Sequence, residues 1–365
     1  MSGTMRNCMG KCVPVTFAKP LSTLLVFLLS WWSVSQPPLY GYEELTAYER
    51  NNIEVFKKAN KSVVWVTNSQ IRRDYFTLNV YEMPVGTGTG FVWSNDGIIV
   101  TNHHVIRGAS KITIILADHT SWDAEVIGKA PRKDLAVLRI AAPRHKLVPI
   151  AIGDSSRLEV GRKVLAIGNP FGLDATLTVG VVSALGREIG GENGTKLKGL
   201  IQTDAAINQG NSGGPLLNSA GELIGVNTAI LSPRGGSVGI GFAIPVNAVK
   251  QIIPQLIAYG RIMRPIIGIT PAEDTIARNY GIEGVIVVEA IDGTPAAAAG
   301  LIGLRRNIRG YVLGDIIVKI DDFPIKTNDD LLTALEKYRP GDIVTVETVR
   351  NRRRRTFSVR LGEPY

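Results

Sequence analysis

Short apolar runs, broken by glycine, asparagine and aspartate, follow one another through most of this chain. Examples are residues 62–67, 90–93, 98–100, 111–116, 135–140, 163–167, 176–185 and 222–230. Many short strands with such punctuation are typical of antiparallel sheets. No helical pattern of roughly 10–15 residues lies between consecutive runs, which disfavours a parallel sheet with crossover helices. The sequence therefore predicts a mainly β protein, built as an antiparallel barrel or sandwich.

A long amphipathic pattern over residues 246–259 marks the end of a domain. Apolar side chains recur there at helical spacing, and Pro254 is expected to kink the helix. A second unit begins beyond Gly260. We expect its strands over residues 266–270, 284–289, 315–320 and 343–349, and its helices near 295–300 and 328–338. A chain of 365 residues has room for two cores, so we assign residues 41–260 and 261–365 to two domains.

The remaining residues, 1–40, have the features of a targeting segment. Residues 21–34 carry no charge and follow Arg6, Lys11 and Lys19. This run is shorter than the roughly 20 residues that cross a bilayer, which favours a cleaved signal peptide. The adjacent tryptophans 31 and 32 suit a membrane interface and favour a signal anchor instead. Both alternatives stay open, and both place the folded domains in the periplasm or its equivalent.

Charge and cysteine content narrow the class of protein further. The net charge of +9 is spread thinly, and its densest cluster is five arginines between residues 350 and 355. Because alternating segments flank this cluster, at residues 343–349 and 356–361, we predict the charged tip of a solvated hairpin. A nucleic-acid interface would need exposed aromatic residues among the cations, so nucleic acid is not an expected partner. Cys8 and Cys12 lie in the targeting segment, and neither a metal nor any other cofactor is expected.

The strongest local signal is the run GNSGGPL at residues 210–216, in which Ser212 is closely flanked by glycines. Glycines allow positive φ angles and let consecutive N–H groups point at one oxygen, so the N–H groups of Gly210 and Ser212, with Asn211 as a third candidate, could form an oxyanion hole. A tight turn between strands is the alternative for this run alone. The run also satisfies the G-x-S-x-G pattern of α/β-hydrolases, but there the histidine follows the serine. All four histidines precede Ser212, which excludes that fold.

A general base must then come from upstream of the serine. His104 follows the apolar run 98–100, and Asp134 opens the apolar run 135–138. Histidine, aspartate and serine occur in this order in chymotrypsin-like proteases. We therefore predict a catalytic triad of His104, Asp134 and Ser212 in a cleft between two barrels.

These motifs together resemble those of the HtrA/Deg family of trypsin-like serine proteases with a PDZ domain. The stretches that carry the resemblance are TNHHV at 101–105, DLAVL at 134–138, QTDAAINQGNSGGPL at 202–216, GNPFG at 168–172 and GFAIP at 241–245. The resemblance spans roughly residues 43–361. It selects His104 over His103, because the family's base immediately precedes the valine. His103 and Gln209 replace the residues commoner at those positions, and neither change removes a catalytic group.

The resemblance implies a chymotrypsin-like double β-barrel followed by a PDZ domain, a small β-barrel or sandwich with two helices. It also implies that residues 228–232 line the substrate cleft, with a small apolar S1 pocket that favours cleavage after small aliphatic residues. The substrate-binding residues implied in this way are Ile207, Thr228, Ala229, Ile230, Leu231 and Ser232. In the PDZ domain, the carboxylate-binding loop implied by the resemblance is Ile266, Ile267, Gly268 and Ile269.

The resemblance further implies how the protein works in the cell. Unfolded or misfolded proteins are the expected substrates of an endopeptidase that needs no ATP, and C-terminal peptides are the expected ligands of the PDZ domain. Family members assemble as trimers, so a homotrimer is expected. A non-proteolytic chaperone on a protease fold is the alternative, although all three triad residues are present.

Overall fold

The computed structural model describes residues 44–364, except 74–79, 171, 173, 191–195, 209, 231–238 and 309; the side chains of 71–73, 80–85, 229 and 230 are also outside the description. The chain divides into a segment 1–46 and a compact unit 47–365. The apolar core clusters of the described residues all lie within the second unit. Residues 44–365 therefore contain the cores needed to fold on their own. The targeting segment lies outside the described residues.

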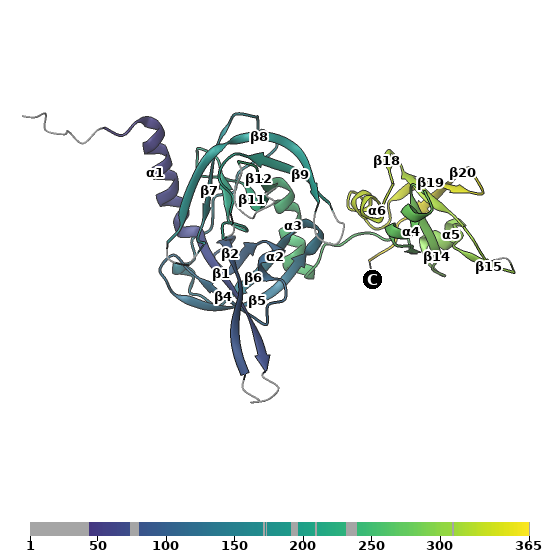
Figure 1. The fold of residues 1–365 in the computed structure, drawn as a ribbon, viewed down its shortest axis with the longest axis horizontal. Helices are drawn as coiled ribbons and strands as arrows, with labels where there is room; N and C mark the ends of the chain where they lie inside the picture. Colours follow the sequence, from purple (N-terminus) through teal and green to yellow (C-terminus); the bar gives the residue numbers. More distant parts are fainter. Residues whose placement is uncertain are drawn as a thin grey trace, which may run out of the picture. The chain divides into compact units, whose positions relative to one another are not determined.

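The first barrel is closed by strands in the order β1-β2-β3-β6-β5-β4 (Figure 1). Its strands are β1 (Val63–Arg73), β2 (Val80–Val92), β3 (Ile98–Thr101), β4 (Lys111–Ile115), β5 (Ser121–Ala130) and β6 (Leu135–Ile140). Every residue of β3 is buried, and β6 is buried except at Arg139. These two strands pair directly, and they carry the segments that hold His104 and Asp134.

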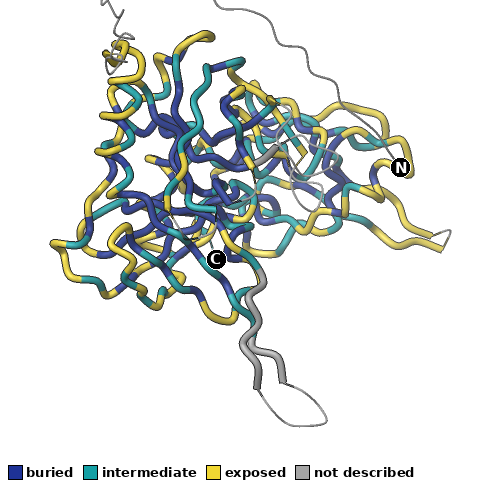
Figure 2. The backbone as a smooth tube through the Cα atoms, turned by 60° about the vertical axis from the view of Figure 1, so that its left-hand side comes forward, coloured by how far each residue is buried: buried dark blue, intermediate teal, exposed yellow. Residues whose placement is uncertain are grey.

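The second barrel is closed in the order β10-β11-β12-β9-β8-β7. Its strands are β7 (Lys163–Gly168), β8 (Thr176–Gly190), β9 (Lys196–Thr203), β10 (Pro215–Leu217), β11 (Leu223–Ile230) and β12 (Gly241–Pro245). Ser212 lies just before β10, in the loop that follows β9. In Figure 2 the buried segments follow the inner strands, whereas exposed segments gather in turns and at strand ends.

Few helices accompany the barrels. They are α1 (Ala47–Ala59), η1 (Asn60–Ser62), α2 (His103–Ile106), η2 (Pro131–Lys133), η3 (Arg144–Lys146) and α3 (Val246–Tyr259). The apolar face of α3 packs in one cluster with Leu135 of the first barrel and Leu165 of the second. Because both barrels share this core, their relative placement is fixed by side-chain packing. Gly260, with φ of 71°, caps α3 by donating its N–H to the Leu256 carbonyl at 3.0 Å.

The C-terminal domain has a separate sheet and a separate core. Strands β13 (Ile269–Pro271), β14 (Val285–Ala290), β17 (Ile316–Ile320), β19 (Ile343–Arg350) and β20 (Arg353–Arg360) form the sheet in that order, and β18 (Phe323–Pro324) pairs with β17. The strands β15 (Arg305–Asn307) and β16 (Gly310–Val312) form a separate hairpin. The helices are α4 (Asp274–Asn279), α5 (Pro295–Ala299) and α6 (Asn328–Leu335).

The architecture confirms the predicted mainly β fold of two barrels followed by a smaller β domain. The predicted bounds of the helix at 246–259 and of the strand at 135–140 agree with α3 and β6. The sequence did not predict β5, β9, β10, β12 or α4, and the second helix near residue 328 ends earlier than expected, at Leu335. Among the described residues, no helix combines the length and the apolar character that crossing a membrane requires.

Candidate active site

His104 is positioned by a single helical turn at the end of a buried strand. Strand β3 ends at Thr101, whose hydroxyl donates to the Thr89 carbonyl at 2.7 Å. The next residue, Asn102, is extended and buried, and α2 begins immediately after it. The imidazole of His104 thus leaves the barrel wall with 36% of its side chain exposed. A base must be accessible to substrate in this way.

Asp134 is held in a conformation that points its carboxylate at this imidazole. It follows η2 with φ of 51°, a left-handed conformation that aspartate tolerates better than most residues. The amide of Asn102 donates to the Asp134 carbonyl at 2.8 Å, which fixes the backbone. His104 Nδ1 lies 2.8 Å from Asp134 Oδ2, and the His104 N–H donates to Oδ1 at 3.0 Å. The carboxylate therefore binds both the ring and the backbone of His104.

A third donor to this carboxylate comes from the second barrel. The Thr228 hydroxyl donates a hydrogen bond to Asp134 Oδ2. In the pairing of β11 with β12, Asn227 lies opposite Ala243 and Ala229 opposite Phe242, so Thr228 is the extra residue of a bulge. This bulge turns a buried side chain toward the other barrel. Sequence reasoning placed Thr228 in the substrate cleft and missed this contact with Asp134, for which a threonine in an apolar run gave no signal.

Ser212 and His104 line the same cavity, which has a volume of 450 Å³. The other lining residues are Asn68, Gly86, Thr87, Val105, Arg107 and Gly210. No hydrogen bond joins the Ser212 hydroxyl to the His104 ring in the part of the chain that the structure describes. Catalytic hydrogen bonds are often long or poorly aligned in unliganded enzymes and tighten when substrate binds. His104 and Ser212 thus face one cavity, and Asp134, which does not line it, contacts the His104 ring.

The loop around Ser212 is tightly held by hydrogen bonds. Gly210 has φ of 104°, and a β-carbon there would overlap Pro170. The Thr89 hydroxyl donates to the Gly210 carbonyl, so this carbonyl points into the protein rather than into the cavity. The Asn211 N–H donates to the Asn208 carbonyl at 3.2 Å and the Gly213 N–H to the Asn227 carbonyl at 2.8 Å.

These hydrogen bonds show which of the candidate oxyanion donors are already bonded within the loop. Asn211 uses its N–H within the loop, and its side chain also bonds to Asn208 N and Ala206 O. The N–H groups of Gly210 and Ser212 have no acceptor among the described residues. These two groups are therefore the ones available to bind an oxygen in the cavity.

The structure describes only part of the implied S1 pocket. Ile207 is fully buried and packs against Gly241, where a β-carbon would overlap the Ile207 side chain. Strand β11 includes Ala229 and Ile230, but the structure describes only their backbone. Leu231 and Ser232 lie outside the described residues.

In the C-terminal domain, a cavity of 340 Å³ lies between β13 and α6. It is lined by residues 264–269, together with Pro271, Ile291, Asn328, Leu331, Leu332 and Leu335. Gly268 has φ of 85°, and a β-carbon there would overlap Thr294. The N–H groups of Ile267 and Gly268 have no backbone acceptor among the described residues, whereas Ile266 donates to the Gly362 carbonyl at 3.0 Å. The implied carboxylate loop thus borders an apolar groove.

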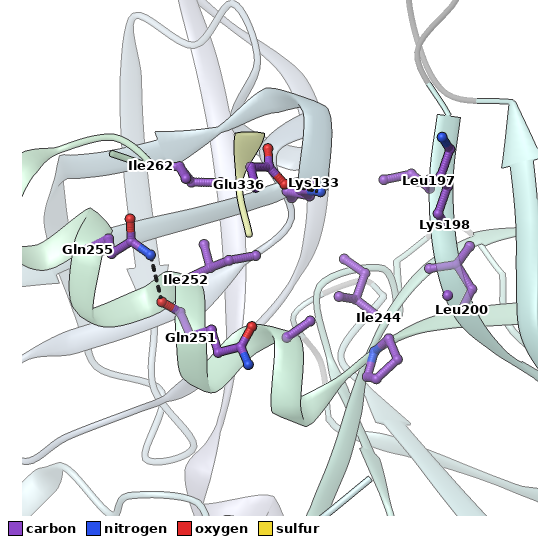
Figure 3. A pocket seen from close by; sticks show the side chains of 13 residues that line it. Lys133, Leu197, Lys198, Leu200, Ile244, Gln251, Ile252, Gln255, Ile262 and Glu336 are labelled. Atoms are coloured by element: carbon purple, nitrogen blue, oxygen red, sulfur yellow. Dashed lines mark hydrogen bonds and ion pairs between the residues drawn. The ribbon is translucent and has the colours of Figure 1, made fainter. Parts of the chain in front are cut away.

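A further cavity, of 250 Å³, contains none of the triad residues (Figure 3). Its walls come mainly from β9 and from α3, where the Gln255 amide donates to the Gln251 carbonyl at 3.1 Å. Lys133 and Glu336, which form an ion pair at 2.6 Å, also line it. Nothing in its lining is suited to peptide hydrolysis.

Comparisons with known proteins agree with this geometry. Residues 88–226 match the trypsin-like peptidase domain model, and residues 265–361 match the PDZ domain model. "Protease Do-like 1, chloroplastic" of Arabidopsis thaliana is 50% identical over 96% of this chain and 79% of its own length. A "Probable periplasmic serine endoprotease DegP-like" of Brucella suis is 43% identical over 77% of this chain, which spans only 53% of that relative.

Solved structures give the same picture. The "HtrA-type protease AlgW with decapeptide" superposes with a TM-score of 0.66 at 31% identity, covering 86% of this chain and 99% of that one. The "serine endoprotease from Yersinia pestis" has a TM-score of 0.61 at 32% identity and covers 88% of this chain and all of its own.

Proposed function

Because this chain belongs to the HtrA/Deg family of trypsin-like serine proteases, we propose that it cleaves unfolded or damaged proteins with the triad His104, Asp134 and Ser212. The single observation that carries this proposal is the hydrogen bond between the Asp134 carboxylate and His104 Nδ1, at 2.8 Å. A carboxylate there leaves the other ring nitrogen, Nε2, free to act as a base toward Ser212.

The reaction proceeds through an acyl-enzyme. Ser212 Oγ attacks the scissile carbonyl carbon while His104 Nε2 takes its proton, and the imidazolium is stabilised by Asp134. His104 then protonates the leaving amine as the peptide bond breaks. A water molecule, activated by the same imidazole, hydrolyses the ester and frees Ser212. The enzyme needs neither ATP nor another cofactor for these steps.

The N–H groups of Gly210 and Ser212 stabilise the tetrahedral intermediate. Each lacks another acceptor among the described residues, and each such donor is worth about 3 kcal/mol in known oxyanion holes. Asn211, the third candidate from the sequence, contributes by holding the loop through its bonds to residues 206 and 208.

The substrate is an extended chain that pairs with residues 228–232, of which 228–230 belong to β11. Ile207 supplies an apolar wall, so we propose cleavage after small aliphatic residues. Unfolded chains offer extended segments more readily than folded proteins do, which explains a preference for unfolded chains. A measured preference for lysine or arginine before the cut would contradict this assignment.

The PDZ domain binds C-terminal peptides. The N–H groups of Ile267 and Gly268 are available for a carboxylate, and the groove between β13 and α6 accepts a strand with apolar side chains. Peptide binding there regulates the peptidase. The neighbour solved with a decapeptide supports peptide binding in general.

We also propose that the protein acts as a homotrimer outside the cytoplasm. Its apolar segment at residues 21–34 directs export and is then either cleaved or retained as a membrane anchor. Relatives named as periplasmic support a location in the periplasm or cell envelope.

The test is cleavage of a chemically unfolded reporter protein by residues 44–365, with Ser212→Ala as the matched control. We expect the wild type to cut, the variant to lose at least about a thousandfold in kcat, and peptides with apolar C-termini to accelerate the wild type. If neither form cuts and both suppress aggregation of the reporter, the protein is a chaperone and the proposed activity is wrong.

A further inference from the structure

The hairpin formed by β15 and β16 exposes apolar side chains to solvent. Ile308, in its turn, is fully exposed at 106%, and Tyr311 is 76% exposed. Val312 and Leu313, which follow, are also exposed. This hairpin pairs with no other strand of the described chain, and a two-stranded hairpin alone is marginally stable. Large apolar residues exposed along such a hairpin, from Ile308 in its turn to Val312 at its base, point to contact with another surface.

Cations accompany these apolar side chains. Arg305 and Arg306 of β15 are exposed. The tip of the β19–β20 hairpin adds Arg352, Arg353, Arg354 and Arg355, all exposed. Arg354 is 3.5 Å from Glu347, which neutralises part of its charge. The turn at Asn351 and Arg352 has φ angles of 53° and 60°, as a two-residue hairpin loop requires.

The two hairpins emerge from one end of the domain. Val349 of β19 lies opposite Ile316, which follows the β15–β16 hairpin by only a few residues. Arg350 forms an ion pair with the fully buried Asp315, and Asp315 also accepts the Ile302 N–H at 2.8 Å. The bases of both hairpins are therefore joined, and in Figure 1 both hairpins lie on the right of this domain, β19–β20 above and β15–β16 below.

We propose that this tip face, defined as the β15–β16 hairpin together with Arg352–Arg355, binds the surface of an anionic lipid membrane. Ile308 enters the boundary between head groups and acyl chains, and Tyr311 lies at the head-group level. The arginines contact lipid phosphates, each contributing roughly 1 kcal/mol near an anionic surface. The proposal concerns the PDZ domain's outer end and does not depend on the proposed peptidase activity.

Charge and shape favour a membrane over other occupants. A second copy of this chain would bring like charges together at the tip face, which opposes association. A nucleic acid is bound by cations interleaved with stacking aromatic rings, whereas the described part of this face offers the single ring of Tyr311. A fully exposed isoleucine at a turn contributes little to binding phosphates but suits insertion into lipid.

The experiment is sedimentation of residues 44–365 with vesicles of phosphatidylcholine, with and without phosphatidylglycerol. This protein lacks the N-terminal apolar segment, so that segment cannot cause binding. We expect binding to the anionic vesicles that weakens as salt is added. Arg353→Glu should weaken it at least about fivefold, because it removes one favourable charge and adds a repulsive one. Ile308→Ser should weaken it several-fold while leaving the salt dependence unchanged.

Arg360→Glu is the matched control, since Arg360 is an exposed arginine of the same strand at the opposite end of the hairpin. It should bind like the wild type. Equal losses for Arg353→Glu and Arg360→Glu would mean attraction by net charge alone and would overturn the proposal. Equal binding to neutral vesicles, or binding to DNA that exceeds binding to anionic vesicles, would also overturn it. Cleavage of the soluble reporter should be unchanged in every variant. A failure of the proposed membrane binding can therefore be told apart from a failure of the proposed peptidase activity.

Discussion

At the scale of single residues, the proposed triad depends on how the Asp134 carboxylate is held. Its donors are the His104 ring, the His104 N–H and the Thr228 hydroxyl, and they come from both barrels. Among the described residues, no hydrogen bond joins the Thr228 side chain to Ser212 or His104, so it acts as a positioning residue for His104 through Asp134. A carboxylate that lost this donor would be free to rotate away from the ring.

We expect Thr228→Val to lower kcat about tenfold with KM little changed, because valine keeps the shape and removes one donor to a buried acceptor. Steady-state kinetics on a short peptide substrate measure both constants. Thr228→Ser keeps the hydroxyl and should retain most of the activity. If only the packing of the threonine methyl group mattered, Thr228→Ser would lose activity and Thr228→Val would not. A Thr228→Val enzyme with wild-type kcat would show that the contact does not position the triad.

At the same scale, the sequence offered candidates for the reacting groups but none for the residues that orient them. Ser212 and His104 lie in distinctive local patterns, and their order along the chain selected the class of protease. Thr228 and Thr89 act through side-chain hydrogen bonds between segments distant in sequence, such as residues 228 and 134. A threonine inside a strand carries no local pattern that would indicate such a partner.

At the scale of elements, β6 and α3 were predicted with their observed bounds, whereas several short or partly exposed strands were missed. Strand β6 is buried almost throughout and α3 has a clear apolar face, so both are distinct in the sequence. Strand β5 alternates between exposed and half-buried residues along most of its length, and β10 has only three residues. Such strands are defined by their neighbours in the barrel rather than by their own composition.

The contact between Asp321 and Tyr338 in the C-terminal domain should make the stability of this domain depend on pH. Asp321, between β17 and β18, accepts hydrogen bonds from the Tyr338 hydroxyl at 2.6 Å and from the Thr345 N–H at 2.7 Å. The bond from Tyr338 holds the pKa of Asp321 below its usual value, and burial raises the pKa of Tyr338 to about 12. The stability that ionised Asp321 contributes is therefore present above about pH 4 and is lost as the pH falls. The stability that protonated Tyr338 contributes is present below about pH 10 and is lost as the pH rises through about 12.

We expect Tyr338→Phe to destabilise the C-terminal domain by about 1 kcal/mol at pH 7 and by less at pH 3, because protonation of Asp321 weakens the bond that the variant lacks. Urea unfolding followed by hydrogen exchange of β19 measures this domain within residues 44–365. Tyr311→Phe removes an exposed hydroxyl of the same domain and should be neutral. A penalty for Tyr338→Phe that grew toward pH 3 would contradict the assigned role of the charge.

At the scale of the whole molecule, the cleft exists because two barrels share one core. Phe91 and Leu135 of the first barrel, Leu165 and Leu200 of the second, and the apolar face of α3 form one cluster. The proposed triad is divided between the barrels, with His104 and Asp134 on one and Ser212 on the other. Loss of packing at this shared core should therefore misplace the nucleophile relative to its base, even though no catalytic group is changed.

Leu256 of α3 tests this coupling, since it is fully buried in the shared cluster and lies against Gly128 of β5. We expect Leu256→Ala to destabilise the protease domain by about 2–5 kcal/mol, through lost apolar contacts and a residual cavity, and to lower peptidase activity well below the unfolding temperature of the wild type. The C-terminal domain has its own core cluster, so its affinity for a C-terminal peptide should stay at the wild-type value. Ile257→Ala, at the neighbouring and 37% exposed position of the same helix, is the matched control and should cost far less. Calorimetry, kinetics and peptide titration on the wild type, Leu256→Ala and Ile257→Ala separate these outcomes. Parallel losses of peptide affinity and peptidase activity in Leu256→Ala would show that the two domains do not fold on independent cores.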